Sequence, residues 1–351
     1  MDVPDGHLAA VDHGGSLERA RALFPNAPEP YVDLSTGINP HSYPLFNLPA
    51  TALTRLPETA RLHTLKEVAA AAYEAAGAGN VCAAPGTQIL LPVVASLAPP
   101  GRARVLAPTY AEHARAARIV GHQVEQVATL DALEEADLAV VVNPNNPDGR
   151  IISSGRLLAL ASKMRARGGL LVVDEAFMDV GPRAESMAGH VEEGGMVVLR
   201  SFGKFFGLAG IRLGFALADP ATATRLEAQL GPWAVSGPAV EYGIAALADS
   251  DWQEAMRGRL AGEAARLDTL FSRFDVPVVG GTTLYRYIEF SGARRLFHAL
   301  GEKGIVLRHF HDRPNALRAG LPASHEEWER LGAALAEWRS ESPDQAEEMP
   351  A

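Results

Sequence analysis

The sequence has little cysteine, no long apolar run and fewer basic than acidic side chains. Its 351 residues contain one cysteine, Cys82, which excludes an intramolecular disulfide and fits a reducing cytoplasm. No apolar run approaches the roughly 18 residues of a membrane span, and the N-terminus, Met1 to Asp5, is too acidic for a signal peptide. We therefore expect a soluble, cytoplasmic protein with no membrane partner.

The deficit of positive charge excludes further classes of partner. The 32 Lys and Arg residues face 42 Asp and Glu residues, so the formal net charge is −10 at pH 7. Nucleic acids favour a basic surface, so no nucleic-acid partner is expected. The 11 histidines show no HExxH or comparable ligand spacing, which argues against a metal enzyme. An anionic ligand would need a local cluster of arginines and amide groups.

Short apolar runs alternate with helical patterns between residues 80 and 220. Four runs predict strands, at residues 103–107, 138–142, 169–173 and 195–199. Their continuous apolar character is typical of strands that are buried on both faces of a parallel sheet. Candidate helices between them cover residues 110–120, 153–167 and a segment after Arg183. The alternation predicts an open α/β sheet, and ligands on such sheets bind at the carboxyl ends of the strands.

The rest of the chain predicts a second, smaller domain. Residues 1–50 are rich in Pro, Gly, His and Asn and are expected to form an irregular N-terminal arm. The large domain is expected over residues 51–235. Residues 236–340 follow as a connector helix and a small α+β domain, with three short strands around one helix. The acidic tail at 341–351 is expected to be disordered.

The most informative stretch sets Lys204 among glycines, with Ser201 before it and Arg212 after it. A lysine amine can form a Schiff base with an aldehyde cofactor, and a hydroxyl and a guanidinium can hold the phosphate of such a cofactor. A glycine-flanked lysine alone is more often a solvated loop residue. Two upstream blocks, at residues 172–177 and 143–149, each follow or end a predicted strand. Their presence favours a cofactor-binding role for the Lys204 stretch.

Together the three blocks resemble the fold-type I pyridoxal-phosphate (PLP) enzymes of the aspartate aminotransferase superfamily, over about residues 7 to 339. The resemblance implies an α/β fold-type I PLP-dependent transferase fold, with a mostly parallel sheet in the large domain and a small C-terminal α+β domain. It implies PLP as cofactor, with Lys204 as its covalent partner and proton shuttle. Asp174 would lie beside the ring nitrogen, which a carboxylate keeps protonated. Asn146 would bond the phenolic oxygen, and Tyr110 would stack on the ring.

The same resemblance implies a site for the cofactor phosphate. Gly86, Thr87 and Gln88 precede an apolar helical stretch and match the phosphate loop of the superfamily. Backbone amides at a helix N-terminus suit a phosphate. Ser201 and Arg212 would join them.

Substrate recognition is implied by residues at the two ends of the chain. Arg318 matches the arginine that binds the substrate carboxylate, for which a planar fork is well suited, and Asn39 would assist it. A second anion site, for a substrate phosphate, has candidates in His13, Gly14, Gly15 and Arg308. An ordinary loop histidine and a charge at a strand edge are the alternatives for His13 and Arg308.

Within the superfamily, the closest branches are histidinol-phosphate aminotransferases and the threonine-phosphate decarboxylases of cobalamin synthesis. Three features favour the decarboxylases: the arm with His13-Gly14-Gly15 and residues 33–40, Phe177 in place of a tyrosine, and the run at residues 231–238. The implied reaction converts L-threonine O-3-phosphate to (R)-1-aminopropan-2-yl phosphate and CO2. The aminotransferases are the main alternative. A PLP-fold regulator is disfavoured because no basic helix-turn-helix segment is evident.

One departure from the resemblance concerns subunit contacts. Relatives commonly carry a tyrosine where this chain has Leu56, and that tyrosine reaches the cofactor phosphate of the partner subunit. Leucine has no hydrogen-bond donor on its side chain, so this contact is in doubt. A homodimer is still expected from the resemblance.

Overall fold

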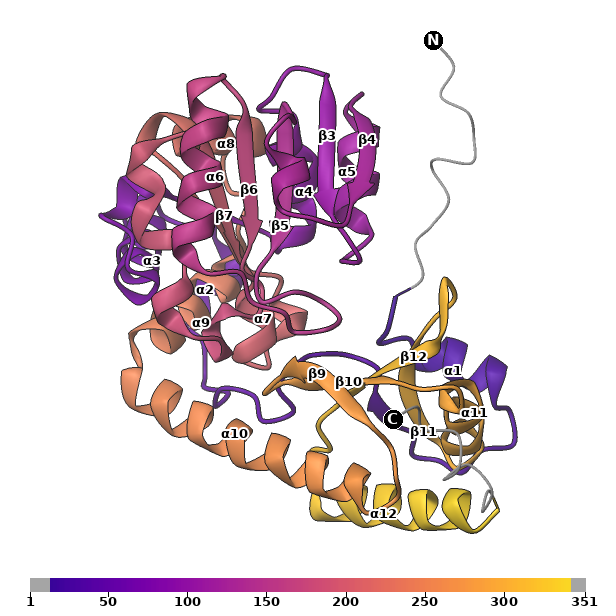
Figure 1. Cartoon of the computed structure of the whole chain (residues 1–351). Coiled ribbons are helices and arrows are strands. Elements are labelled where there is room, and N and C mark those ends of the chain that lie inside the picture. The colour runs from indigo at the N-terminus through magenta and orange to yellow at the C-terminus, as the bar shows by residue number, and fades with distance from the viewer. Residues whose placement is uncertain (1–12, 342–351) are drawn as a thin grey trace. The chain divides into compact units, whose positions relative to one another are not determined.

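The computed structural model describes residues 13–341, and these form two compact units (Figure 1). Unit 1 contains residues 42–146 and 150–254, and unit 2 contains residues 13–41, 147–149 and 255–341. These limits lie at other places than the domain boundaries expected from the sequence. The domain boundaries expected from the sequence stay a prediction. Within residues 13–341, no helix has the length and apolar character to span a membrane.

Unit 1 is built on a seven-stranded sheet with the order β2-β8-β7-β6-β5-β3-β4. The strands are β2 Val81–Ala84, β3 Arg102–Leu106, β4 Gln123–Val127, β5 Leu138–Val142, β6 Leu170–Asp174, β7 Met196–Arg200 and β8 Gly214–Leu217. All neighbours pair in parallel except β8, which is antiparallel to both β2 and β7. The expected parallel α/β sheet is confirmed.

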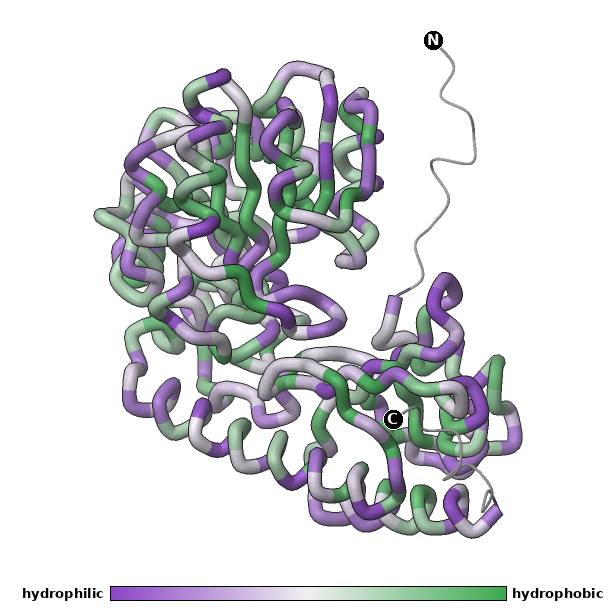
Figure 2. Tube along the Cα trace, in the orientation of Figure 1, coloured by the Kyte–Doolittle hydropathy of each residue, from purple (hydrophilic) through white to green (hydrophobic). Residues whose placement is uncertain are grey.

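The central strands are apolar because helices cover both faces of the sheet. All five residues of β5 are buried, and Figure 2 shows the central strands of this sheet as strongly hydrophobic. Leu138 and Val140 belong to one apolar cluster with side chains of helices on one face. The residues that alternate with them, Ala139 and Val141, point to the opposite face and are buried as well. A strand with this environment has no position for a polar side chain.

Two helices of unit 1, α8 and α9, begin with a side-chain cap. The helices of this unit are α2 Thr51–Thr54, α3 Thr59–Tyr73, α4 Thr87–Ala95, α5 Glu112–Ile119, α6 Ser154–Ala166, α7 Phe202–Phe205, α8 Pro220–Leu230 and α9 Gly237–Ala248. Asp219 accepts hydrogen bonds from the amides of Ala221 and Thr222 at the start of α8. Ser236 does the same for Ala239 at the start of α9. These bonds satisfy amide groups that the first turn of a helix leaves without a partner.

Unit 2 contains a five-stranded sheet with the order β1-β11-β12-β10-β9. Its strands are β1 Val32–Leu34, β9 Val278–Thr282, β10 Tyr285–Glu289, β11 Ile305–Phe310 and β12 Arg313–Gly320. Only β1 and β11 pair in parallel. The helices are α1 Leu17–Leu23, α11 Ala293–Glu302, α12 His325–Ser340 and α10 Ser250–Ser272, whose first residues belong to unit 1.

The structure corrects four details of the secondary structure predicted from the sequence. The segment after Arg183 forms short 3-10 turns instead of a helix, since Pro182 and several glycines interrupt it. The long helix expected after Pro220 is divided into α8, α9 and α10, and Gly231 ends the first of them at a φ of 75°. The small domain has four strands between residues 278 and 320, where three were expected, and the expected irregular arm contains α1 and β1. The predicted disordered tail lies outside the described residues, apart from Glu341.

Candidate active site

Polar side chains of unit 1 gather where neighbouring parallel strands end. Asn143 follows β5, Asp174 is the last residue of β6 and Ser201 follows β7. These three strands are neighbours in the sheet. Their carboxyl ends therefore share one edge, which is the edge where ligands bind in open α/β sheets.

Asp174 is a buried carboxylate that is fixed by two hydrogen bonds. Its Oδ2 lies 2.8 Å from Nε2 of His113, and its Oδ1 accepts a hydrogen bond of 3.0 Å from the amide of Ala176. His113 is itself buried, on α5. An ionised carboxylate only accepts hydrogen bonds, so the imidazole carries a proton on Nε2. His113 thus fixes the orientation of the Asp174 carboxylate.

Sequence reasoning gave His113 no role. The available signal was its position three residues after Tyr110, within the helix predicted over residues 110–120 and already expected near the cofactor. The ring centroids of these two residues are 6.0 Å apart. Spacing along a helix says nothing about the depth at which a histidine lies, so the pairing with Asp174 could only come from the structure.

Gly86 and Arg212 lie against each other at the N-terminus of α4. Gly86 has a φ of 86°, and a Cβ atom at this position would come within 2.5 Å of the Arg212 Nη2 atom. The positive φ favours glycine, and a side chain at this position would displace the guanidinium of Arg212. The arrangement places a cation beside the free amides that begin at Thr87. These groups fit a phosphate.

The side chain of Gln88 holds Tyr110. The Tyr110 hydroxyl donates to Gln88 Oε1 at 3.0 Å, and Gln88 Nε2 donates to Glu112 Oε2 at 2.8 Å. Glu112 is buried, and Arg115 lies 3.2 Å from the same oxygen. This chain of contacts fixes the tyrosine ring. The assignment of Gln88 to the phosphate loop, through its backbone amide, stays a prediction, and its side chain contacts the residue predicted to stack on the ring.

Lys204 lies on a short helix and Asn146 on a loop of unit 1. Lys204 lies in α7, with its Nζ atom 5.5 Å from the centre of the buried Phe177 ring. Asn143 and Asn145 are fully buried and bond to Ile152 and to the segment around Pro108. Asn146 is only partly buried. The two earlier asparagines shape the loop that presents Asn146.

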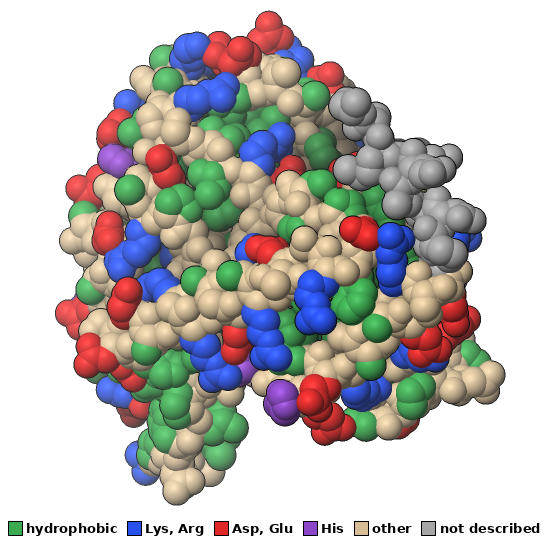
Figure 3. Space-filling model, turned by 60° about the horizontal axis from the view of Figure 1, so that its bottom comes forward, with side chains coloured by type: hydrophobic (Ala, Val, Ile, Leu, Met, Phe, Trp, Pro, Cys, Tyr) green, Lys and Arg blue, Asp and Glu red, His purple; other side chains and the backbone are tan. Residues whose placement is uncertain are grey.

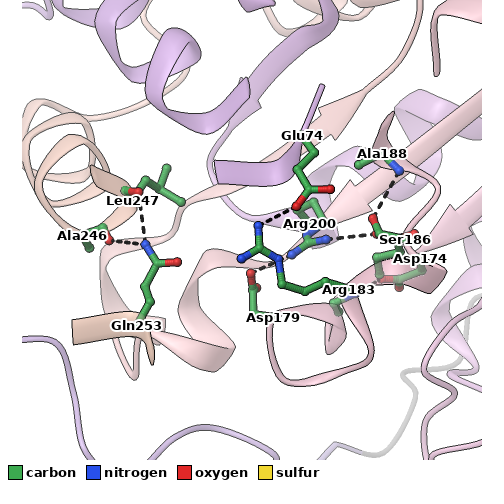
Figure 4. A network of polar contacts seen from close by, with 12 residues as sticks. Glu74, Asp174, Asp179, Arg183, Ser186, Ala188, Arg200, Ala246, Leu247 and Gln253 are labelled. Carbon is green, nitrogen blue, oxygen red and sulfur yellow. Dashed lines mark hydrogen bonds and ion pairs between the residues drawn. The ribbon is translucent and has the colours of Figure 1, made fainter. Parts of the chain in front are cut away.

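A buried ion-pair network supports the ends of β6 and β7. Arg200, at the end of β7, binds Asp179 at 2.6 Å (Figure 4) and Glu175 at 3.0 Å. Its guanidinium lies 4.3 Å from the centre of the Tyr73 ring. Burial raises the pKa of Glu175. Burial also acts to lower the pKa of Arg200, but the two carboxylates outweigh it and the pKa is raised. Because Glu175 follows Asp174 and Arg200 precedes Ser201, the network fixes both residues at the sheet edge.

The predicted substrate residues all lie in unit 2, and several converge on Ser35. Arg318 is buried, and its Nη2 atom donates to the Ser35 carbonyl at 3.0 Å. The amide of Gly15 donates to the Ser35 hydroxyl at 2.7 Å, and a Cβ atom on Gly14 would come within 2.4 Å of the Ser35 carbonyl. Arg308 stands directly opposite Arg318 on the neighbouring strand.

Asn39 and His13 complete the predicted substrate set. Asn39 is buried, and its Oδ1 atom accepts a hydrogen bond of 2.9 Å from the amide of His41. The His41 ring contacts both oxygens of Glu263, at 2.8 and 2.9 Å, so a helix of the unit holds this turn. Sequence reasoning missed both His41 and Glu263. His13 is exposed and lines the same cavity as Gly14, Gly15 and Arg308.

Comparison with known proteins agrees with this arrangement. A family model described as aminotransferase class I and II matches residues 34–335. The chain belongs to the aminotransferase class I and II family. It is 41% identical over 328 residues to a threonine-phosphate decarboxylase of Pseudomonas aeruginosa, which covers 93% of this chain and 97% of the relative. It is also 41% identical over 331 residues to a threonine-phosphate decarboxylase of a Sinorhizobium species, with 93% and 98% covered.

Solved structures share the fold of this family member. The crystal structure of histidinol-phosphate aminotransferase from Sinorhizobium meliloti, in complex with pyridoxal-5'-phosphate, matches with a TM-score of 0.78. The match covers 97% of this chain and 98% of that chain, at 20% identity. Similarity at this level of identity shows a common fold.

The network in Figure 4 gives a prediction about stability. Arg200→Met leaves Glu175 and Asp179 buried without their cation, so it should destabilise the protein by about 3–5 kcal/mol. Arg183→Met is the matched control, because Arg183 is 50% exposed and its pair with Glu74 should contribute less than about 1 kcal/mol. Urea unfolding of the three proteins measures the difference. Equal losses in the two variants would contradict the account.

The contact between His113 and Asp174 gives a prediction about cofactor binding. His113→Phe keeps a ring in place but removes the hydrogen bond, and should weaken PLP binding by about ten- to a hundredfold. His122→Phe is the control, since His122 is another buried histidine of unit 1, bonded to Gly101 and Ala95. Absorbance titration with PLP measures both affinities. An unchanged affinity in His113→Phe would show that the contact does not support cofactor binding.

Proposed function

We propose that this family member is a PLP-dependent decarboxylase that converts L-threonine O-3-phosphate to (R)-1-aminopropan-2-yl phosphate and CO2. The observation that carries the proposal is the 41% identity to two threonine-phosphate decarboxylases, over nearly the whole length of all three chains. The sequence features that favour this branch, including Phe177 and the His13-Gly14-Gly15 arm, support it.

The cofactor site of the proposal lies in unit 1. When bound, PLP supplies an electron sink for the charge that develops at Cα of the substrate as CO2 leaves. Thr87, Ser201 and Arg212 hold its phosphate. Asp174, oriented by His113, binds the ring nitrogen and favours its protonated form.

The remaining cofactor contacts come from three side chains. Tyr110, whose hydroxyl is bonded to Gln88, stacks on the ring. Asn146 donates a hydrogen bond to the phenolic oxygen. Lys204 would hold the cofactor aldehyde through Nζ and would return a proton to Cα. Phe177 offers Lys204 an aromatic face and no hydrogen-bonding group.

Unit 2 supplies the proposed substrate contacts. Arg318 binds the substrate carboxylate, and its bond to the Ser35 carbonyl fixes the orientation of the guanidinium. Asn39 assists it. His13, Arg308 and the amides of Gly14 and Gly15 bind the substrate phosphate.

We further propose a cytoplasmic homodimer that makes the linker of the cobalamin nucleotide loop. Large apolar side chains of unit 1 are at least 45% exposed, which supports burial against a second copy: Leu45, Leu53, Leu56, Ile89 and Trp233. A single, buried cysteine fits a reducing compartment. Figure 3 shows basic side chains mixed with acidic ones on the face that it draws, which supports a small-molecule substrate and no nucleic-acid partner.

The proposal is tested by supplying PLP-loaded protein with L-threonine O-3-phosphate in the absence of any keto acid. Sustained release of CO2, with one aminopropanol phosphate formed per CO2, is the expected result. Mass spectrometry and a coupled CO2 assay measure the two products. No CO2, but conversion of the cofactor to pyridoxamine phosphate with histidinol phosphate as amino donor, would replace the decarboxylase with an aminotransferase.

Removing the proposed covalent lysine gives a second test. Lys204→Ala should abolish CO2 release and the absorbance band of the lysine-bound cofactor, because no other group of this kind lies in the motif. Lys163→Ala is the control, since Lys163 is 57% exposed and paired with Glu134. Full activity in Lys204→Ala would remove the central assignment of the site.

A further inference from the structure

A cavity of about 310 Å3 lies in unit 2, beside the end of β1. β1 pairs with β11 only as far as Leu34 and Leu307, and the next residues of β11 border the cavity. Helices α1 and α11 and the segment from His13 to Ser16 form the other walls. Its cationic lining residues are His13, Arg19, Arg294, His298, Arg308, His309 and His311.

The lining contains no carboxylate among the residues that the structure describes. Three arginines are permanently charged, and four histidines add imidazole nitrogens that can donate hydrogen bonds. Such a concentration of positive charge is local, because the chain as a whole has a formal net charge of −10. Between residues 13 and 341, no group of three or more His, Cys, Asp or Glu side chains is arranged to hold a metal ion. The cavity therefore suits an anion.

His309 marks the part of the cavity that lacks an acceptor. Its Nε2 atom is buried and has no hydrogen-bond partner among residues 13–341. Its ring lies 5.2 Å from Phe297 and 5.4 Å from His311, measured between ring centroids. Burial lowers the pKa of His309, and the positive charges of His311, Arg294, His298 and Arg308 lower it further. A bound oxyanion would supply both the acceptor and the counter-charge.

His309 and the substrate arginine lie on opposite faces of the sheet of unit 2. Arg308 is the cross-strand partner of Arg318, so these two side chains share a face. His309 is the next residue on β11 and points to the other face, which bears Phe297 of α11. The part of the cavity around Arg294, His298, His309 and His311, here called the histidine pocket, is therefore separate from the carboxylate site at Arg318.

We propose that the histidine pocket binds a phosphate-type oxyanion, in addition to the phosphate of the proposed substrate. Arg294 and His298 of α11 donate to the oxyanion from one side, and His309 donates from β11. The assignment goes beyond the proposed decarboxylation and does not depend on which amino acid the enzyme accepts. A phosphate monoester and free phosphate present the same oxygens, and both are candidate ligands.

The test follows the histidine pocket directly by NMR, on PLP-loaded protein with 13C-labelled histidine. The His309 resonance is assigned from a His309→Gln variant and followed against pH, with and without inorganic phosphate. The expected result is a rise in the pKa of His309 when phosphate is added, because a nearby anion favours the charged imidazole. No response of His309 to phosphate would overturn the proposal.

Two neighbouring arginines of α11 provide the matched variants. Arg294→Gln removes a charge from the histidine pocket and should raise the phosphate concentration needed for the His309 response by about tenfold. Arg295→Gln removes the same charge from the adjacent residue, which does not line the cavity, and should respond as the unaltered protein does. Both arginines are exposed, so both variants are expected to fold, which their unfolding temperatures will check. If both variants need the same phosphate concentration for the His309 response, the response reflects the overall charge of the protein, and the proposed site is wrong.

The source of the ligand is resolved by repeating the titration with phenyl phosphate. A tighter response than with inorganic phosphate assigns the pocket to phosphate monoesters, and a weaker response assigns it to free phosphate. Because the readout needs no turnover, it is independent of the decarboxylation assay. Arg294→Gln should also keep full CO2 release in phosphate-free buffer, which separates this site from the substrate site.

Discussion

The burial of both faces of the parallel sheet is the constraint on which the candidate active site of unit 1 depends. Strands such as β5 have no solvent-facing side, so polar groups are displaced to the ends of the strands. Asn143, Asp174 and Ser201 occupy those ends on three neighbouring strands. The same apolar environment requires each buried polar group to have a partner, and His113 and Arg200 supply partners at this edge.

Unit 2 differs from unit 1 because its arginines project from a small, mostly antiparallel sheet. Arg318 is buried and lies 5.0 Å from the centre of the Tyr285 ring, with one nitrogen bonded to the Ser35 carbonyl. Gly14 and Gly15 pack on the same serine, so Ser35 contacts both this segment and Arg318 of β12. In a chain with a net negative charge, unit 2 gathers basic side chains around one cavity.

The sequence predicted most of what depends on local pattern and missed what depends on depth and pairing. The apolar run 138–142 coincides with β5, because a strand buried on both faces is apolar at every position. The edge strand β4 was missed, since its residues Gln123–Val127 are largely exposed and polar. The role of His113 and the ion pairs of Arg200 could not be predicted, because each partner lies more than 20 residues away along the chain. The family motifs predicted Lys204, Asp174 and Arg212 as cofactor residues, and the structure added His113, whose imidazole contacts the Asp174 carboxylate.

The most direct test of the account is a crystal structure of the protein grown with PLP. The account predicts the cofactor phosphate within hydrogen-bonding distance of Thr87 and Arg212, and the ring nitrogen on Asp174, with His113 still bonded to that carboxylate. A phosphate bound away from the N-terminus of α4, or a ring nitrogen without Asp174, would contradict the assignment of this sheet edge as the cofactor site.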